Sequence, residues 1–330
     1  MFTPLKPLRR TARQTTVTLV GLTLAAAAAA QSFAVSTGPA GNTYDTLFQQ
    51  FTAQCQGEVG VPFVGKTSAG SMDNIDRLSN NEVTASISQT DVLAYRSKLE
   101  DMGQIRVLFL LHPEEVHVLV LSEPRKEGGL AGLGGKPVVF DTFSNLRGRR
   151  IGAWGGSLIT AQVLRLQSEV AFTLVEFADQ PTALKALADK SVDALLSVGG
   201  SPQAWLQKLD RRYKLVTFND QEATALKSVY RPARVTYPNL GQTGLVTVAT
   251  DAVLATRQYR TPAMLQMLGR VRECFRAHLA ELQEKPGNHT KWQAISLDAV
   301  SRWPMLELGA NTAAVASTPA APTALAGKAR

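Results

Sequence analysis

The chain has 330 residues, of which 45% are hydrophobic and 19% are charged, a composition typical of a globular protein. The net charge of +8 is concentrated at the two ends, where four basic residues lie before residue 30 and two more close the chain, which leaves +2 for the rest. The rest of the chain has no basic stripe interleaved with aromatic residues. Length therefore allows about two domains, and nucleic-acid binding is not expected.

Residues 1–30 have the pattern of a secretory signal peptide. Basic residues between Lys6 and Arg13 precede an apolar stretch of 14 residues, Val17 to Ala30. This stretch is too short to cross a bilayer comfortably, and small residues at positions 28–30 suit cleavage, with a second cleavage point after Ala34. No cysteine that could carry a lipid lies at either point. We therefore expect an exported, soluble protein of the periplasm.

The chain contains two cysteines, Cys55 and Cys274. In an oxidising compartment an even number of cysteines can pair as disulfides. Both cysteines also lie in predicted helices with apolar neighbours, so two buried free thiols are an equally open interpretation. A disulfide would close a long loop and stabilise the fold by about 4–5 kcal/mol in the chain-entropy model.

Short β-branched runs alternate with helical patterns along most of the chain, which predicts an α/β fold with a largely parallel sheet. Two apolar runs, 105–111 and 116–121, are predicted to be buried strands joined by a turn. Glu114 and Glu115 lie in this turn and are expected to face solvent. His112 and His117 flank the turn and are assigned a structural role. The other predicted strands of the first part are 33–35, 60–64 and 83–88, and its helices begin at Thr43, Ser71 and Asp91.

A second series of the same kind begins at residue 150. Its predicted strands are 150–154, 172–177, 192–198 and 215–218, and its helices are 157–166 and 181–188. An apolar run at 245–254 and a helix at 262–283 then follow. We expect a first lobe formed by residues 31–122 and 239–307, and a second lobe formed by residues 123–238. Because ligands of open α/β sheets bind at the carboxyl ends of strands, a ligand cleft is expected between the lobes.

Two segments are expected to stand outside this pattern. Residues 123–136 are a glycine-dense insertion, in which Leu130 and Pro137 occupy positions where a phosphate-binding loop requires glycine and Ser or Thr. We interpret this insertion as a flexible surface loop or a connector between lobes. The tail, 308–330, is rich in Ala, Pro and Thr and is predicted to be disordered.

Several predicted strands end in small hydroxyl residues and glycines that also begin a helix. Any one such group is what a helix N-cap requires. Together with the helix dipole and backbone N–H groups, they can also hold an anionic ligand without a charged side chain. Because this chemistry recurs at five strand ends, we assign these groups to ligand binding. The assigned residues are Thr37, Gly38, Asn42, Thr43, Tyr44, Gly70, Ser71, Gln89, Thr90, Gly156, Ser157, Gly199 and Gly200.

The order of these motifs resembles the TAXI family, the extracytoplasmic solute receptors associated with TRAP transporters. The resemblance covers nearly all of residues 33–305 and implies a two-lobed fold of the type II periplasmic-binding-protein kind. It also implies a trapped organic acid or amino acid, such as glutamate. Asn42 replaces a glycine that is usual in the family, and Leu158-Ile159 replace smaller or polar residues. The stretches that carry the resemblance are 35–44, 70–74, 81–83, 88–91, 113–117, 145–152, 193–195, 198–200, 247–249 and 289–292.

The expected function is capture of a small ligand by lobe closure and its delivery to the membrane subunits of a TRAP-type transporter. No catalysis, cofactor or metal is expected, and the four histidines show no metal-binding spacing. A ligand-sensing protein that signals to a membrane sensor would have the same binding module and is the alternative. An exported hydrolase is disfavoured, because Ile159 takes the place of the final glycine of a Gly-x-Ser-x-Gly motif around Ser157.

Overall fold

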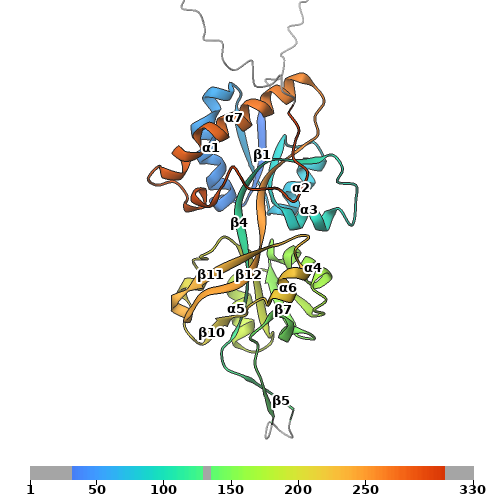
Figure 1. Ribbon diagram of the computed structural model, residues 1–330, viewed down its shortest axis with the longest axis vertical. Helices are drawn as coiled ribbons and strands as arrows, with labels where there is room; N and C mark the ends of the chain where they lie inside the picture. The colour runs from blue at the N-terminus through green and yellow to red at the C-terminus, as the bar shows by residue number, and fades with distance from the viewer. Residues whose placement is uncertain (1–31, 129–134, 309–330) are drawn as a thin grey trace, which may run out of the picture. The chain divides into compact units, whose positions relative to one another are not determined.

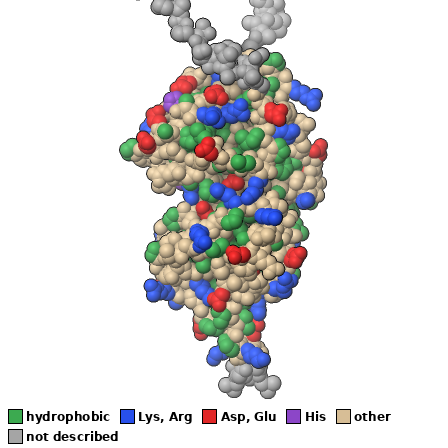
Figure 2. Space-filling view, in the orientation of Figure 1, with side chains coloured by type: hydrophobic (Ala, Val, Ile, Leu, Met, Phe, Trp, Pro, Cys, Tyr) green, Lys and Arg blue, Asp and Glu red, His purple; other side chains and the backbone are tan. Residues whose placement is uncertain are grey.

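The structure, a computed structural model, describes residues 32–128 and 135–308, which fall in one compact unit. The predicted signal peptide, the centre of the glycine-dense insertion and the tail from residue 309 lie outside the described residues. None of the described helices combines the length and apolar character that a membrane span requires. On the face shown in Figure 2, basic side chains are interspersed with acidic ones.

Strands and helices alternate along the described chain as the sequence predicts (Figure 1). The strands are β1 (Phe33–Gly38), β2 (Phe63–Thr67), β3 (Ala85–Gln89), β4 (Ile105–Leu121), β5 (Arg125–Glu127), β6 (Lys136–Val138), β7 (Arg150–Trp154), β8 (Thr173–Phe177), β9 (Ala194–Gly199), β10 (Tyr213–Leu215), β11 (Arg231–Tyr237) and β12 (Gln242–Arg257). The helices are α1 (Thr43–Val59), α2 (Ser71–Ser79), α3 (Thr90–Arg96), α4 (Ser157–Gln167), α5 (Gln180–Ala188), α6 (Asp220–Ala225) and α7 (Pro262–Glu284). Short 3-10 turns are η1 (Phe143–Leu146), η2 (Leu206–Lys208), η3 (Pro238–Leu240) and η4 (Thr290–Ala294).

The main sheet repeats one strand order in two halves. The first half has the order β2-β1-β3-β12-β4, and the second half has the order β8-β7-β9-β4-β10. In each half the first three strands are parallel, and the fourth, which comes from the other half, runs antiparallel to both neighbours. The strands β4 and β12 thus pass through both halves. This arrangement confirms the predicted α/β fold of the type II periplasmic-binding-protein kind, but the prediction of a largely parallel sheet is wrong, because every pairing of β4 and β12 with a neighbouring strand is antiparallel.

Strand β4 corrects one prediction. The sequence analysis placed a turn between two strands, whereas residues 105–121 form one continuous strand. Pro113, which lacks an N–H, lies opposite Asp251 beside a register shift in the pairing with β12, where the ladder tolerates it. Because the strand continues, Glu114 and Glu115 are only 7% and 9% exposed. The prediction that they form a solvated turn is therefore wrong.

The hydrophobic core changes its membership inside the two shared strands. Leu111 and Ala252 belong to a cluster of the first half, whereas Val116 and Val248 belong to a cluster of the second half. Ile159 at the start of α4 packs against clusters of both halves. The two halves are therefore joined through short central segments of β4 and β12.

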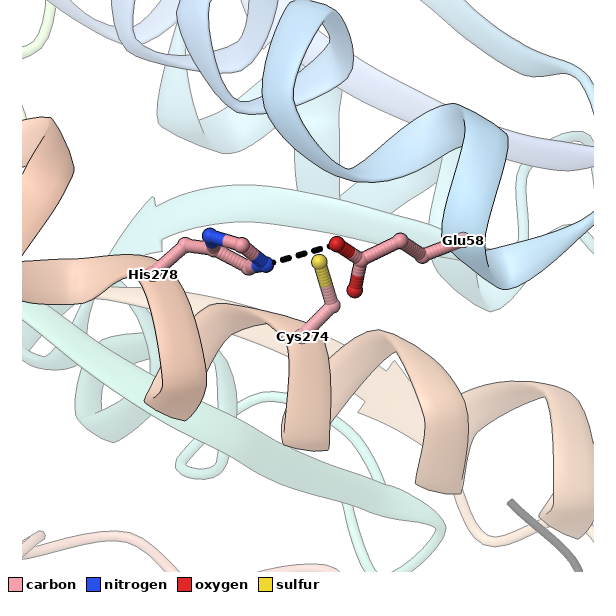
Figure 3. A group of neighbouring side chains, drawn as sticks. All are labelled: Glu58, Cys274 and His278. Carbon is pink, nitrogen blue, oxygen red and sulfur yellow. Dashed lines mark hydrogen bonds and ion pairs between the residues drawn. The ribbon is translucent and has the colours of Figure 1, made fainter. Parts of the chain in front are cut away.

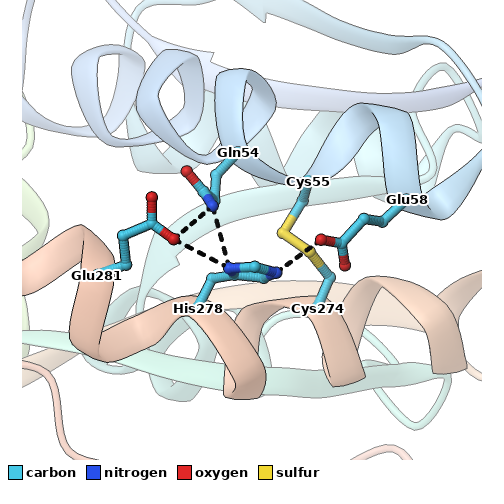
Figure 4. Close-up of a disulfide and its surroundings, with 6 residues drawn as sticks. All are labelled: Gln54, Cys55, Glu58, Cys274, His278 and Glu281. Atoms are coloured by element: carbon cyan, nitrogen blue, oxygen red, sulfur yellow. Dashed lines mark hydrogen bonds and ion pairs between the residues drawn. A yellow bond between two sulfur atoms is a disulfide. The ribbon is translucent and has the colours of Figure 1, made fainter.

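Helices α1 and α7 lie side by side and are cross-linked by a disulfide between Cys55 and Cys274 (Figure 4). Of the two interpretations that the sequence left open, the structure contains the bridge. Phe275 of α7 stacks on Phe109 of β4 with ring centroids 3.8 Å apart, so the linked helices also pack on the sheet. Closing so long a loop contributes about 5 kcal/mol in the chain-entropy model.

Candidate functional site

A buried polar cluster lies where β3, β4 and the first turns of α1 and α2 meet. The Gln89 amide of β3 donates a hydrogen bond to Glu114 Oε2 of β4. The Tyr44 hydroxyl, at the second residue of α1, lies close enough to Ser71, the first residue of α2, and to Glu114 for both to affect the Tyr44 pKa. Tyr44, Ser71, Gln89 and Glu114 are termed the Glu114 cluster below.

Burial sets the charge of this cluster. Desolvation raises the pKa of Glu114 to about 7, and the Gln89 and Tyr44 hydrogen bonds only partly oppose it. Next to it, His112 Nε2 lies 3.9 Å from Glu114 Oε1, and burial lowers the His112 pKa to about 3. At neutral pH His112 is therefore uncharged, and Glu114 is present in both protonation states.

Two buried atoms of this region have no hydrogen-bond partner among the described residues. They are Gln89 Oε1 and His112 Nε2. Leaving a buried polar atom unpaired costs about 1–3 kcal/mol. A Cβ placed on Gly156 would lie 3.8 Å from Gln89 Oε1, so the start of α4 approaches the cluster from the second half. Gln89 Oε1 thus lies where the two halves meet.

Lys291 places a positive charge close to Glu115. Glu115 Oε2 accepts a hydrogen bond from the Ser201 N–H at 2.7 Å, and Lys291 Nζ donates to the Ser201 carbonyl at 3.0 Å. Burial raises the pKa of Glu115, and the Lys291 charge opposes this shift. A Cβ on Gly200 would lie 1.8 Å from Lys291 Cε, so glycine at this position leaves room for the lysine. The turn after β9 is therefore held by Glu115 of the central strand β4 and by Lys291 of η4 in the first half.

Asp91, at the start of α3, links the two halves directly. Its Oδ2 accepts hydrogen bonds from Thr160 of α4 at 2.8 Å and from the Tyr230 hydroxyl at 3.0 Å. Its backbone N–H donates to Thr250 of β12. Burial raises the pKa of Asp91. No described cation pairs with this carboxylate, so hydroxyl groups and the Val92 N–H stabilise its charge, and its Oδ1 has no partner among the described residues.

The structure brings some of the predicted site residues together. Tyr44, Ser71 and Gln89 share one cluster, Gly156 approaches it, and Gly38 lies against the Tyr44 ring. Gly200 lies under Lys291.

The other predicted residues have different neighbours. The Thr37 hydroxyl donates to Asp45, and Thr90 pairs with Thr250. Ser157 Oγ accepts from the Val198 N–H, and Gly199 lies beside Gln203. Asn42 is exposed and makes no side-chain cap bond, and Thr43 and Gly70 occupy partly buried helix starts.

The sequence does not identify Glu114, Glu115 or Lys291 as candidate site residues. The signal for the two acids was the absence of Gly, Asn or Asp between the apolar runs 105–111 and 116–121. Such residues are typical of turns, and a lone proline at a bulge does not end a strand. Lys291 lies in the histidine-capped turn η4, far along the chain, and nothing local indicates its contact with Ser201.

Two cavities lined by other residues lie away from the Glu114 cluster. One of about 300 Å³ is lined by residues that include Thr90, Lys98, Arg302 and Trp303, and another of about 390 Å³ lies beside α7. The candidate site is therefore identified by its polar chemistry and not by cavity volume.

One group of side chains among the described residues has the spacing of a metal site. Glu58, Cys274 and His278 offer ligand atoms that all lie within 4.8 Å of one another (Figure 3). Because Cys274 is bonded to Cys55, its sulfur is not a free thiolate in this structure.

A sequence model of the family described as NMT1-like matches residues 35–268. No curated protein matches the chain significantly.

Among solved structures, a Salmonella typhimurium periplasmic binding protein with high arginine specificity is 15% identical, with 78% of this chain and 99% of that chain covered and a TM-score of 0.46. An arginine transport system periplasmic binding protein of Legionella pneumophila is 13% identical, with 76% and 95% covered and a TM-score of 0.44. The GluR0 ligand-binding core of Nostoc punctiforme, in complex with L-glutamate, is 12% identical, with 79% and 95% covered and a TM-score of 0.43. At these identities and scores, the ligands remain properties of those proteins.

Proposed function

The chain belongs to the NMT1-like family, and we propose that it is an exported solute-binding protein that holds an amino acid or a related organic acid between its two halves. The observation that supports this most is in the Glu114 cluster, where the buried Gln89 Oε1 lacks a partner beside Gly156 of the second half. A ligand placed there would supply the missing hydrogen bonds. Capture without chemical conversion is the proposed activity, and the periplasm is the proposed location.

The charges around the site favour a zwitterionic ligand over a dianion. Glu114 offers a carboxylate with no described cation in contact, which suits an ammonium group. Lys291 near the Gly200–Ser201 turn, together with the N-terminus of α2 at Ser71, suits a carboxylate. We therefore place amino acids ahead of simple dicarboxylates.

The proposed mechanism is closure of the two halves on the ligand. Hydrogen bonds to a charged ligand contribute about 1.5–3 kcal/mol each, so three or four suffice for micromolar affinity, about 8 kcal/mol. A ligand that contacts both halves favours the closed state. Tyr44, Ser71, Gln89 and Glu114 would act from the first half, with Thr37, Gly38, Asn42, Thr43, Gly70 and Thr90 around them. Gly156, Ser157, Gly199 and Gly200 would act from the second.

The resemblance to TAXI receptors supports a TRAP-type transporter as the partner. A membrane sensor would use the same closed form and is the alternative. Co-purification with membrane proteins encoded beside this gene separates the two: retention of permease subunits supports transport, and retention of a sensor kinase supports signalling. We also propose that the lobe boundaries lie near residues 122 and 238, or further inside β4 and β12 where the core clusters change.

A thermal-shift screen tests the binding function. The probes are amino acids, the matching dicarboxylates that lack the amino group, and the matching amines that lack the carboxylate. A ligand at 100 times its Kd adds about 2.7 kcal/mol to stability. Stabilisation by an amino acid alone is the expected result, and mass spectrometry should recover that ligand unchanged. If no probe stabilises the protein the proposal fails, and a converted ligand would indicate an enzyme.

A further inference from the structure

The disulfide between α1 and α7 is surrounded by side chains that bind metals. Glu58 lies one turn after Cys55 on α1, and His278 lies one turn after Cys274 on α7 (Figure 4). Glu58, His278 and the Cys274 sulfur present ligand atoms within 4.8 Å of one another, and Cys55 is bonded to that sulfur. One sulfur, one imidazole and one carboxylate therefore lie together, and the second sulfur, of Cys55, is bonded to the first.

The imidazole is oriented as it would be in a metal site. His278 Nε2 lies 2.7 Å from Glu58 Oε1, and its Nδ1 lies 3.2 Å from Glu281 Oε2. Gln54 donates to the same Glu281 oxygen at 2.8 Å. Metal-ligating histidines usually hold their second nitrogen against a carboxylate in this way, which fixes the ring and its tautomer. Glu281 would thus position His278, while Nε2 faces Glu58.

The disulfide form supplies too few ligands, because a thiolate and not a disulfide sulfur binds metal. With Cys55 and Cys274 reduced, the group contains two thiolates, one histidine and one carboxylate, a set that suits tetrahedral Zn²⁺. We propose that reduction of the Cys55–Cys274 disulfide converts this group into a Zn²⁺ site with Cys55, Cys274, His278 and Glu58 as ligands. The site is independent of the proposed solute-binding function.

The conversion balances in two steps. A dithiol reductant gives two electrons and two protons to the S–S bond and becomes a disulfide itself, leaving two thiols on α1 and α7. Zn²⁺ then displaces the two thiol protons to solvent. His278 would bind through the Nε2 lone pair with its proton on Nδ1, donated to Glu281. The Gln54 NH2 group, which lies 3.0 Å from Nδ1 and donates to Glu281, would then turn away from Nδ1. The metal would restore the cross-link between α1 and α7 that reduction removes.

Zinc titration of the full-length mature protein tests this inference. The protein is prepared in its disulfide form and after reduction with a non-chelating phosphine, and Zn²⁺ binding is measured by competition with a chromogenic chelator. We expect one Zn²⁺ per reduced chain and no comparable binding to the disulfide form. Co²⁺ in place of Zn²⁺ should show thiolate charge-transfer bands. Equal binding by both forms would overturn the proposal.

Variants separate this site from simple thiol binding. In the reduced protein, His278→Ala should weaken Zn²⁺ binding more than about 100-fold, and Glu281→Gln about 10–100-fold. Glu284→Gln, which changes an exposed carboxylate of the same helix outside the group, is the matched control and should bind as the wild type does. Wild-type affinity in His278→Ala would contradict the assignment. If the reduced chain loses its circular dichroism signal, Zn²⁺ should restore that signal in the wild type and not in His278→Ala, and failure to do so also overturns the proposal.

Discussion

Two buried polar groups that each include residues of β4 share histidine, glutamine and tyrosine, and the first group alone also contains an acid, Glu114. The Glu114 cluster and its neighbour His112 combine histidine, glutamine and tyrosine, and so does the group formed by His117, Gln203 and Tyr237. Both nitrogens of His117 have partners, Gln203 Nε2 at 3.0 Å and the Tyr237 hydroxyl at 2.9 Å. Gln203 Oε1 accepts from Ser197 and Trp205.

The first group leaves Gln89 Oε1 and His112 Nε2 unpaired, whereas the second leaves no side-chain atom of its three residues unpaired. The shared residue types therefore do not distinguish the two groups, whereas Glu114 and the unpaired atoms of the first group do. We expect the saturated group to stabilise the fold and the unsaturated group to contribute to the proposed ligand binding. The predictions below test whether this division holds.

The largest effect should be in the pH dependence of stability. The pKa of Glu114 is about 7 in the folded protein against an ordinary 4.5, so the native state holds this proton more tightly than the unfolded state. Its contribution to stability therefore falls as pH rises from about 4.5 to about 7, by up to about 3 kcal/mol. Glu114→Gln has no titrating group at this position. Its free energy of unfolding should therefore rise relative to that of the wild type between pH 4.5 and pH 7.

Urea unfolding of both proteins at several pH values measures this difference. His112 and His117, with pKa values lowered by burial to about 3 and about 4, act in the opposite sense, but they are present in both proteins and largely cancel. A stability difference that stays constant from pH 4.5 to 7 would show that Glu114 titrates normally.

Glu114→Gln should also weaken ligand binding about 10–100-fold, because a hydrogen bond to a charged group contributes about 1.5–3 kcal/mol. Calorimetry with the ligand found by thermal shift measures this loss. If Glu114 binds an ammonium group, wild-type affinity should rise as pH passes upward through about 7. Affinity that falls over this range would instead assign a protonated Glu114 to a ligand anion.

The two tyrosines form a matched pair. Tyr237→Phe removes a partner of His117 and of the Gln203 N–H, so it should destabilise the fold by about 1–3 kcal/mol without changing affinity. Tyr44→Phe should reduce affinity with a smaller loss of stability. Urea unfolding and calorimetry on both variants measure stability and affinity. A loss of affinity in Tyr237→Phe, with a larger loss of stability in Tyr44→Phe, would contradict the roles assigned to the two groups.

Ser71→Ala should reduce affinity about tenfold, the effect of one lost hydrogen bond. Ser157→Ala is its counterpart in the second half, where the hydroxyl already accepts from the Val198 N–H. It should affect stability more than affinity. An unchanged affinity for Ser71→Ala in calorimetry removes that residue from the site.

Asn42→Ala should have the smallest effect. The side chain is exposed and makes no cap bond, so stability should change by less than about 0.5 kcal/mol and affinity by less than about twofold. A loss of affinity of tenfold or more would show that the turn before α1 contacts the ligand, as the sequence predicts.

Local patterns carried much of the fold prediction. The strand–turn–helix order around residues 33–59, 85–96 and 150–167 follows from apolar runs ending in small polar residues, and all three units are present. Strand β11 was missed, because Arg231, Pro232 and Arg234 resemble a loop in isolation. Its pairing with β12 offsets these weak local preferences.

The candidate site was less accessible to prediction. Tyr44, Ser71 and Gln89 follow from their places at strand ends, and the structure brings them into one cluster. Glu114 and Lys291 do not follow, because their burial and contacts depend on how β4 continues past Pro113 and how η4 reaches Ser201. Such tertiary contacts produce no repeating pattern of apolar and polar residues from which they could be predicted.

The position of Glu114 and Glu115 at the crossing of β4 has a mechanical consequence. Both residues pair with Thr250 and Ala249 of β12, at the place where the two shared strands pass from one half to the other. In any rotation about these paired strands, a residue moves in proportion to its distance from the axis. The two carboxylates would then stay nearly stationary, while loops at the outer rims sweep the widest arcs. One end of a ligand bound at such a pivot would stay nearly fixed. Ligands of different size would then stop the outer loops at different degrees of closure.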